Sequence, residues 1–224
     1  TPFVDHHSTI FILLAFYSLI FGINNSNYFY ISIIPTLSVL SFLSKQTPSA
    51  YGILGLFFLI IFYIILEKKS AKKIVISLIK GSMFSLIILF IFFYLTKINL
   101  SNFIEQYILY AQTIGNTRIH LTGFEILNLL IEFKFIFIFL IALFCIIFYI
   151  PKKKLNKNKH YFNITVIITF SLLMIIHQKL TFNQNYIFFL IPLLAAFLHI
   201  YFVFIFPKKK IFLTFFTIVC LLSV

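Results

Sequence analysis

The hydrophobic residues of this chain form long continuous runs, separated by short polar stretches. These runs lie at about residues 9–23, 28–43, 50–66, 74–96, 133–150, 161–176 and 186–206, and another begins at Ile211. A helix needs roughly 20 apolar residues to cross about 30 Å of hydrocarbon, so the pattern predicts about seven or eight membrane spans. The first two runs are short for a full crossing, and a thin or tilted helical hairpin is the alternative for them.

Composition agrees with this pattern, because 62% of the 224 residues are hydrophobic and only 10% are charged. A soluble domain of this length cannot bury so much apolar surface. A transmembrane β-barrel is excluded because the runs do not alternate apolar with polar residues. The predicted fold is all-α, a polytopic transmembrane helix bundle that forms a single domain over residues 1–224. The chain opens on Thr1 and ends inside an apolar run, so we expect a fragment cut at both ends.

Residues 97–132 differ from the spans, because apolar residues recur there every three or four positions among polar ones. This spacing predicts amphipathic helices that lie in the membrane interface. The polar turn at 112–118 separates two such helices. We therefore predict an interfacial segment over 97–132 within the bundle.

The net charge of +13 comes mainly from lysines that cluster between the apolar runs. Such clusters are typical of cytoplasmic loops, so the charge does not predict nucleic-acid binding. The clusters at 67–73, 151–159 and 207–210 are separated by two spans each and therefore fall on one side. We predict that these three loops are cytoplasmic. The same count places Asp5, Lys45, the 97–132 segment and the stretch after the sixth run together on the outer face.

A polar group, Asp5-His6-His7-Ser8, stands directly before the first apolar run. A carboxylate and two imidazoles are groups that ligate a divalent metal or transfer a proton. Consecutive helical residues point about 100° apart, so at most one histidine can share a site with Asp5. The alternative is that Asp5 or Ser8 only caps the helix that follows.

The other polar candidates on the predicted outer face suit a phosphate or a sugar. Lys45, with Gln46 beside it, offers donors to a phosphate. An interfacial lysine that reaches toward lipid headgroups is the alternative. Arg118 and His120 are candidates of the same kind, against the simpler interpretation of a solvated loop.

The densest polar cluster outside the lysine loops follows the sixth run. Its amide and imidazole groups suit sugar hydroxyls or a lipid headgroup, and an ordinary turn is the alternative. The substrate-binding candidates in it are His177, Gln178, Asn183 and Gln184.

Three features together resemble the membrane-embedded glycosyltransferases of the GT-C type, in particular protein mannosyltransferases and aminoarabinose transferases. The stretch from Pro2 to His7 resembles that group's acidic residue at an outer helix start. The stretch from Leu40 to Thr47 resembles its lysine-bearing helix end, and the segment after the fourth run resembles its interfacial helices. The likeness covers mainly residues 1–66, and the remainder matches in architecture only.

This resemblance implies transfer of a sugar from a polyprenyl-phosphate-linked donor to a glycan, lipid or protein acceptor on the non-cytoplasmic face. It places Asp5 at the catalytic cavity, near a divalent metal ion where members use one, with His6 and His7 as further metal-ligand candidates. It places Lys45 near the donor phosphate. The family's main catalytic acid belongs to an earlier loop, so the catalytic base stays unknown and we expect this fragment alone to be inactive.

Two other functions remain open on the sequence. A transporter or lipid flippase is typically built from repeated halves with broken helices and mid-membrane ionisable groups, and the chain has no evident repeat. A non-catalytic membrane subunit would carry the same polar clusters as mere loops. For each of these functions we expect an integral membrane protein of the bacterial inner (plasma) membrane.

Overall fold

The computed structural model describes residues 3–110, 113, 126–149, 157–181 and 185–206. These residues form helices joined by turns and include no strand, which confirms the predicted all-α class. Five helices are long and apolar enough to cross a membrane, and they fit an integral membrane protein: His6–Asn24, Gln46–Leu66, Lys68–Thr96, Asn158–Leu180 and Ile187–Ile205. Two shorter apolar helices cover Tyr28–Ser44 and Lys134–Phe148, so the higher count of seven or eight spans stays a prediction.

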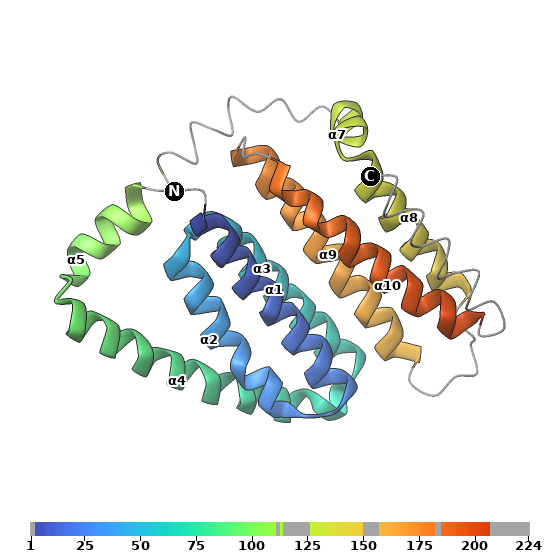
Figure 1. Cartoon of the computed structure of the whole chain (residues 1–224). Helices are drawn as coiled ribbons and strands as arrows, with labels where there is room; N and C mark the ends of the chain where they lie inside the picture. Colours follow the sequence, from blue (N-terminus) through green and yellow to red (C-terminus); the bar gives the residue numbers. More distant parts are fainter. Residues whose placement is uncertain (1–2, 111–112, 114–125, 150–156, 182–184, 207–224) are drawn as a thin grey trace. The chain divides into compact units, whose positions relative to one another are not determined.

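The chain divides into two compact units, Thr1–Thr122 and Gly123–Val224, and each is described by itself. The described helices of the first unit are α1 (Phe3–Asn24), α2 (Tyr28–Ser44), α3 (Gln46–Leu66), η1 (Lys68–Ser70), α4 (Ala71–Thr96), α5 (Leu100–Phe103) and η2 (Ile104–Leu109). Helices α1, α2 and α3 pack side by side, as Figure 1 shows. Helix α4 packs on α2 and then diverges from it, and α5 with η2 turns back toward the C-terminal end of α2 (Figure 1).

The first helix is longer than the hydrophobic run predicts. It begins at Phe3 and has 22 residues, so the expectation of a short first span is wrong. The polar residues before the run continue the helix because the hydroxyl of Ser8 is buried and bonded to α2 rather than to a helix end. Helix α2 has 17 residues and spans about 26 Å at 1.5 Å per residue, close to the short run that the sequence shows.

Local sequence sets the turns between these helices. Ser26 adopts a left-handed φ of 52° in the turn after α1, and the Asn27 side chain caps α2 by accepting from the Phe29 amide at 3.1 Å. Helix α3 starts at Gln46, earlier than predicted, with Pro48 in its first turn as predicted. Lys97, with a φ of 53°, ends α4.

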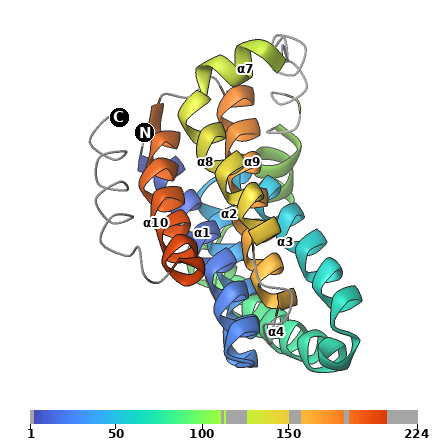
Figure 2. The same cartoon turned by 90° about the vertical axis from the view of Figure 1, so that its right-hand side faces the viewer.

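The second unit contains α7 (Ile126–Glu132), α8 (Lys134–Tyr149), α9 (Lys157–Thr181), η3 (Asn185–Phe189) and α10 (Leu190–Ile205). Helix α8 packs against both α9 and α10, and α7 lies at the N-terminal end of α8 (Figure 2). The fully buried side chains of this unit include Leu143, Phe162, Phe170 and Met174.

Helix α9 has 25 residues and extends beyond the predicted run of 161–176 at both ends. It takes in Lys157 and Lys159 from the predicted lysine loop, and His177 and Gln178 from the predicted outer turn. Both of the latter side chains are buried in the packed helices. The predicted loop at 207–210, the rest of the loop at 151–156 and the span from Ile211 lie outside the described residues.

Candidate functional site

Three helix ends of the first unit meet at one polar corner, which we define as Ser8 of α1, Ser41 of α2, Lys45 between α2 and α3, and Gln46 of α3. The hydroxyl oxygens of Ser8 and Ser41 lie 3.1 Å apart, and Ser41 donates to the Ser8 carbonyl at 2.8 Å. Both serines are fully buried, so these bonds satisfy groups that would otherwise be costly inside an apolar bundle. The alternative that Ser8 only caps a helix is therefore wrong, because Ser8 lies inside α1 and joins it to α2.

Lys45 is the residue between α2 and α3, and its backbone is held from three sides. Its amide donates to the Ser41 carbonyl at 3.0 Å, and its carbonyl accepts from Ser8 at 3.1 Å and from Ser49. The residue is extended, with φ −160° and ψ 136°, and its side chain is half-buried. The fold thus fixes the backbone from which the Lys45 side chain extends. A side chain that binds a phosphate at a defined position requires a fixed backbone of this kind.

Tyr107 of η2 docks the segment after α4 onto this corner. Its hydroxyl lies 2.6 Å from the Phe42 carbonyl and 2.7 Å from the Leu43 carbonyl, the last carbonyls of α2 that face it. Gln46 donates from its side-chain amide to the Tyr107 carbonyl at 2.9 Å. The Tyr107 ring packs edge-on against Phe42, with centroids 5.7 Å apart. Tyr107 was not predicted as a site residue; its place one helical turn from Phe103 is the signal that marks the docking face.

Burial raises the pKa of Tyr107 from its ordinary value of 10.0 to about 12. The neutral hydroxyl is the form that donates to α2, so docking is fully favoured below pH 10. Between about pH 10 and pH 12 the undocked tyrosine loses its proton first, and we expect docking to weaken as the pH rises through this window.

Spin labels at Ala50 and Leu109, with Cys145 and Cys220 replaced by serine, would report this change as a widening distance distribution. In Tyr107→Phe we expect a broader distribution at neutral pH and no change between pH 9 and about pH 12. A pH response that survives Tyr107→Phe would assign the effect to another group.

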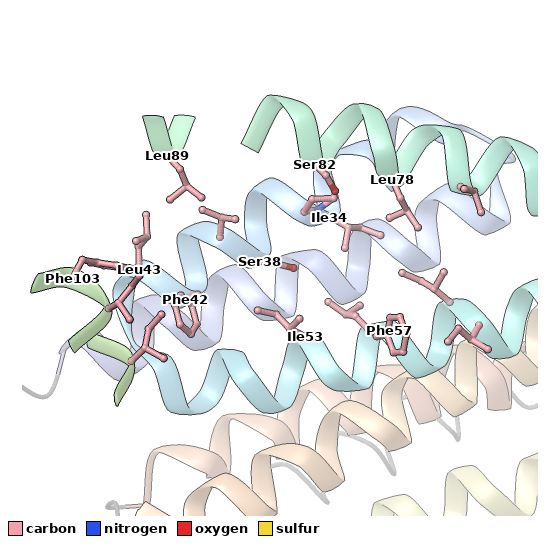
Figure 3. Close-up of a pocket in the computed structure, with 18 of the residues that line it drawn as sticks. Ile34, Ser38, Phe42, Leu43, Ile53, Phe57, Leu78, Ser82, Leu89 and Phe103 are labelled. Atoms are coloured by element: carbon pink, nitrogen blue, oxygen red, sulfur yellow. The ribbon is translucent and has the colours of Figure 1, made fainter. Parts of the chain in front are cut away.

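An apolar groove of about 860 Å³ runs along the first unit, and its lining includes Phe42 and Leu43 near the C-terminal end of α2. Residues of α2, α3 and α4 form its walls, and Phe103, Ile104 and Ile108 of the docked segment close the end next to Leu43 (Figure 3). Among the lining residues only Ser38 and Ser82 carry a polar side chain. The volume is within the range of ligand pockets, and the lining suits a long hydrocarbon chain.

The predicted group before the first run lies in the first turns of α1. His6 and His7 are exposed, and the side chain of Asp5 lies outside what the structure describes. The backbone of Asp5 is within α1, so Asp5 is not the residue that precedes the helix. No three His, Cys, Asp or Glu side chains cluster within the described residues, and the divalent metal at Asp5, His6 and His7 stays a prediction.

None of the other predicted substrate-binding residues is described at the polar corner. Arg118 and His120, and likewise Asn183 and Gln184, lie outside the described residues. His177 and Gln178 are buried in the last turns of α9 in the second unit. Next to them Lys179 forms an ion pair of 2.8 Å with Glu132, which ties the end of α9 to the end of α7. The alternative of an ordinary turn is therefore wrong at His177 and Gln178, because both lie in α9, and their role in substrate binding stays a prediction.

The structure therefore brings together Lys45 and Gln46, from the predicted set, with Ser8, Ser41 and Tyr107, which were not predicted as site residues. Comparison of the chain with protein-family models, with curated proteins and with solved structures gave no match.

Proposed function

We propose that this protein is a membrane glycosyltransferase that takes its sugar from a polyprenyl-phosphate-linked donor and passes it to a glycan, lipid or protein acceptor on the non-cytoplasmic face. The observation that carries this proposal is the groove of about 860 Å³, whose lining includes Leu43, two positions before the fixed backbone of Lys45. A hydrocarbon chain in the groove leaves its phosphate at the groove's end. A polyprenyl-phosphate-linked sugar has this shape, with a long hydrocarbon chain and a phosphate at one end.

The chemistry of such a transfer matches the groups at the corner. When the sugar leaves, negative charge develops on the lipid phosphate, and a fixed cation stabilises it. Lys45 supplies that cation, and Gln46 supplies the side-chain N–H that is not bonded to the Tyr107 carbonyl. A carboxylate must also activate the acceptor hydroxyl, and Asp5 is the candidate in this chain. A divalent ion, if bound by Asp5 with His6 or His7, would add charge stabilisation at the same membrane surface.

A lipid flippase is the alternative that shares the groove. A flippase must carry a charged headgroup through the membrane, and ionisable or polar groups along the path reduce the cost of that step. The groove offers Ser38 and Ser82 and otherwise apolar side chains. This lining favours a bound tail with a stationary headgroup over passage of the headgroup.

Loss of the Lys45 charge is expected to weaken binding of the lipid phosphate. In phosphatidylcholine nanodiscs, Lys45→Gln should raise the dissociation constant for a polyprenyl phosphate about fivefold to tenfold, because one interfacial cation contributes about 1 kcal/mol. Lys45→Arg should retain most of the affinity. Lys97→Gln removes the same charge from the end of α4 and should change the constant less than about twofold. Equal losses in Lys45→Gln and Lys97→Gln would contradict a phosphate site at the corner.

A transfer assay separates the two functions. Membranes that contain the full-length protein would receive a donor with a radiolabelled sugar, and the readout is label in the acceptor fraction. The proposal expects Asp5→Asn and Lys45→Gln to lose transfer while they insert normally in the membrane. Movement of a labelled lipid between leaflets, with no transfer in the wild type, would overturn the enzyme and support the flippase.

A further inference from the structure

A second cavity lies at the crossing of α2 and α4. It has a volume of about 410 Å³ and is lined by Phe29, Ser32, Ile33 and Thr36 of α2 and by Lys80, Gly81 and Phe84 of α4. The cavity lies toward the N-terminal end of α2, whereas the polar corner lies at the C-terminal end. It is therefore separate from the site described above.

The two helices approach closely at the crossing. A Cβ atom at Gly81 would come within 1.9 Å of the Ser32 carbonyl oxygen, so the two backbones are in direct contact. Ser85 donates its single hydroxyl hydrogen to the Gly81 carbonyl at 2.7 Å, so in the 3.1 Å bond between Thr36 and Ser85 the donor is Thr36. Packed backbone and hydrogen-bonded hydroxyls thus form the crossing beside the cavity.

The flank of the cavity faces away from the packed helices. Phe29 is 65% exposed and Phe84 is 57% exposed, although both are apolar and line the cavity. In a helix bundle of this hydrophobicity such aromatic side chains face lipid. The occupant of the cavity therefore comes from the bilayer rather than from water.

Two lysines of α4 border the same seam. Lys80 lines the cavity, and Lys73 lies two turns earlier, on the same face of the helix. The Lys73 amine is 5.6 Å from the centroid of the Tyr28 ring, at the first residue of α2. Five lysines and one glutamate occupy the stretch from Glu67 to Lys80, so the bordering surface is strongly positive. The long side chain of Lys80 reaches from the apolar seam toward the membrane surface.

We propose that this seam is a binding site for an anionic glycerophospholipid, which holds α2 and α4 at their crossing. Lys73 and Lys80 bind the lipid phosphate, and one acyl chain lies against Phe29, Ile33 and Phe84. Basic pockets between membrane helices bind anionic headgroups in this way, because the phosphate adds charge complementarity to the burial of an apolar chain. A zwitterionic lipid fits the apolar part equally well but gains less from the two lysines.

The test compares lipids that differ in headgroup charge. The chain would be reconstituted in phosphatidylcholine nanodiscs with increasing fractions of phosphatidylglycerol, and bound phosphatidylglycerol measured by native mass spectrometry after release. We expect preferential retention of phosphatidylglycerol by the wild type, a loss of about fivefold in Lys80→Gln, and near-normal retention in Lys80→Arg. Lys69→Gln removes an equal charge from η1, which precedes α4 and does not line the cavity, and should change retention less than about twofold.

A second pair of variants tests the acyl-chain part. Phe84→Ala should lower retention of both lipids, whereas Met83→Ala, at an exposed neighbour outside the cavity lining, should not. Equal losses in Lys80→Gln and Lys69→Gln would show a general surface attraction and overturn the site. Unchanged retention in Lys80→Gln, or no preference for phosphatidylglycerol in the wild type, would overturn it as well.

Discussion

Gly81→Ala is expected to separate α2 from α4 and to lower the stability of the first unit more than alanine does at Gly22 or Gly52. The new Cβ atom would lie 1.9 Å from the Ser32 carbonyl oxygen and 2.8 Å from its carbonyl carbon. A backbone atom cannot rotate out of the way, so one helix must move. Added volume in packed interiors typically costs about 1–3 kcal/mol, and we expect at least the upper end of that range.

The matched control is Gly52→Ala on α3, where the added methyl group meets a side chain instead. Its Cβ would lie 2.1 Å from Cγ1 of Ile12, which belongs to α1. A side chain yields more easily than backbone, so we expect the loss to be smaller than in Gly81→Ala. Ile12→Ala removes the clashing atom. The double variant Gly52→Ala with Ile12→Ala should therefore lose less free energy of unfolding than the two single variants lose together, by about 1 kcal/mol or more.

Unfolding in detergent micelles, followed by loss of helical signal as a denaturing detergent is added, measures both effects. No truncation of a side chain should rescue Gly81→Ala in the same way, because the contact is with backbone. A loss in Gly81→Ala that is no larger than in Gly52→Ala would show that α4 does not approach α2 this closely. Close approach through small residues is a common way for membrane helices to associate.

The fold was largely predictable because the hydrophobic signal of a membrane helix is long and continuous. The run at 28–43 and helix α2 differ by a single residue at the C-terminal end. The starts of α1 and α3 were predicted too late, since polar residues such as Ser8 and Gln46 remain helical when a neighbouring element satisfies them. Hydropathy alone does not contain that information, because it depends on which helix packs alongside.

The candidate site was predictable only in part, for the same reason. Lys45 and Gln46 stand out because they are polar at the end of an apolar run. Tyr107 and Ser41 do not stand out, because a tyrosine in an amphipathic segment and a serine in a span are ordinary. Their roles arise from contacts across more than thirty positions of chain, such as the bond between Ser8 and Ser41. The buried position of His177 depends likewise on packing in the second unit.

The groove gives the sharpest test of the proposed substrate class, because its blockage should abolish lipid binding without touching the polar corner. Ser82 of α4 lines the groove and is exposed, so Ser82→Phe places a ring in the groove without a change in the packed core. We expect the affinity for a polyprenyl phosphate to fall more than about tenfold, because the ring occupies the volume that the chain would fill and removes its packing contacts with the groove. Met83→Phe adds a ring at the neighbouring exposed position, outside the groove lining, and is the control.

Photo-crosslinking of a benzophenone-bearing polyprenyl phosphate in phosphatidylcholine nanodiscs, with unlabelled lipid as competitor, measures this affinity and also where the chain lies. In the wild type the crosslinked peptides should come from α2, α3 and α4. Ser82→Phe should lose these crosslinks while Met83→Phe keeps them, and Lys45→Gln should weaken them with the same peptides still labelled. Because the tail and the phosphate contribute separately, a Ser82→Phe variant with unchanged affinity would remove the groove from the site and leave Lys45 as an interfacial lysine in contact with lipid headgroups.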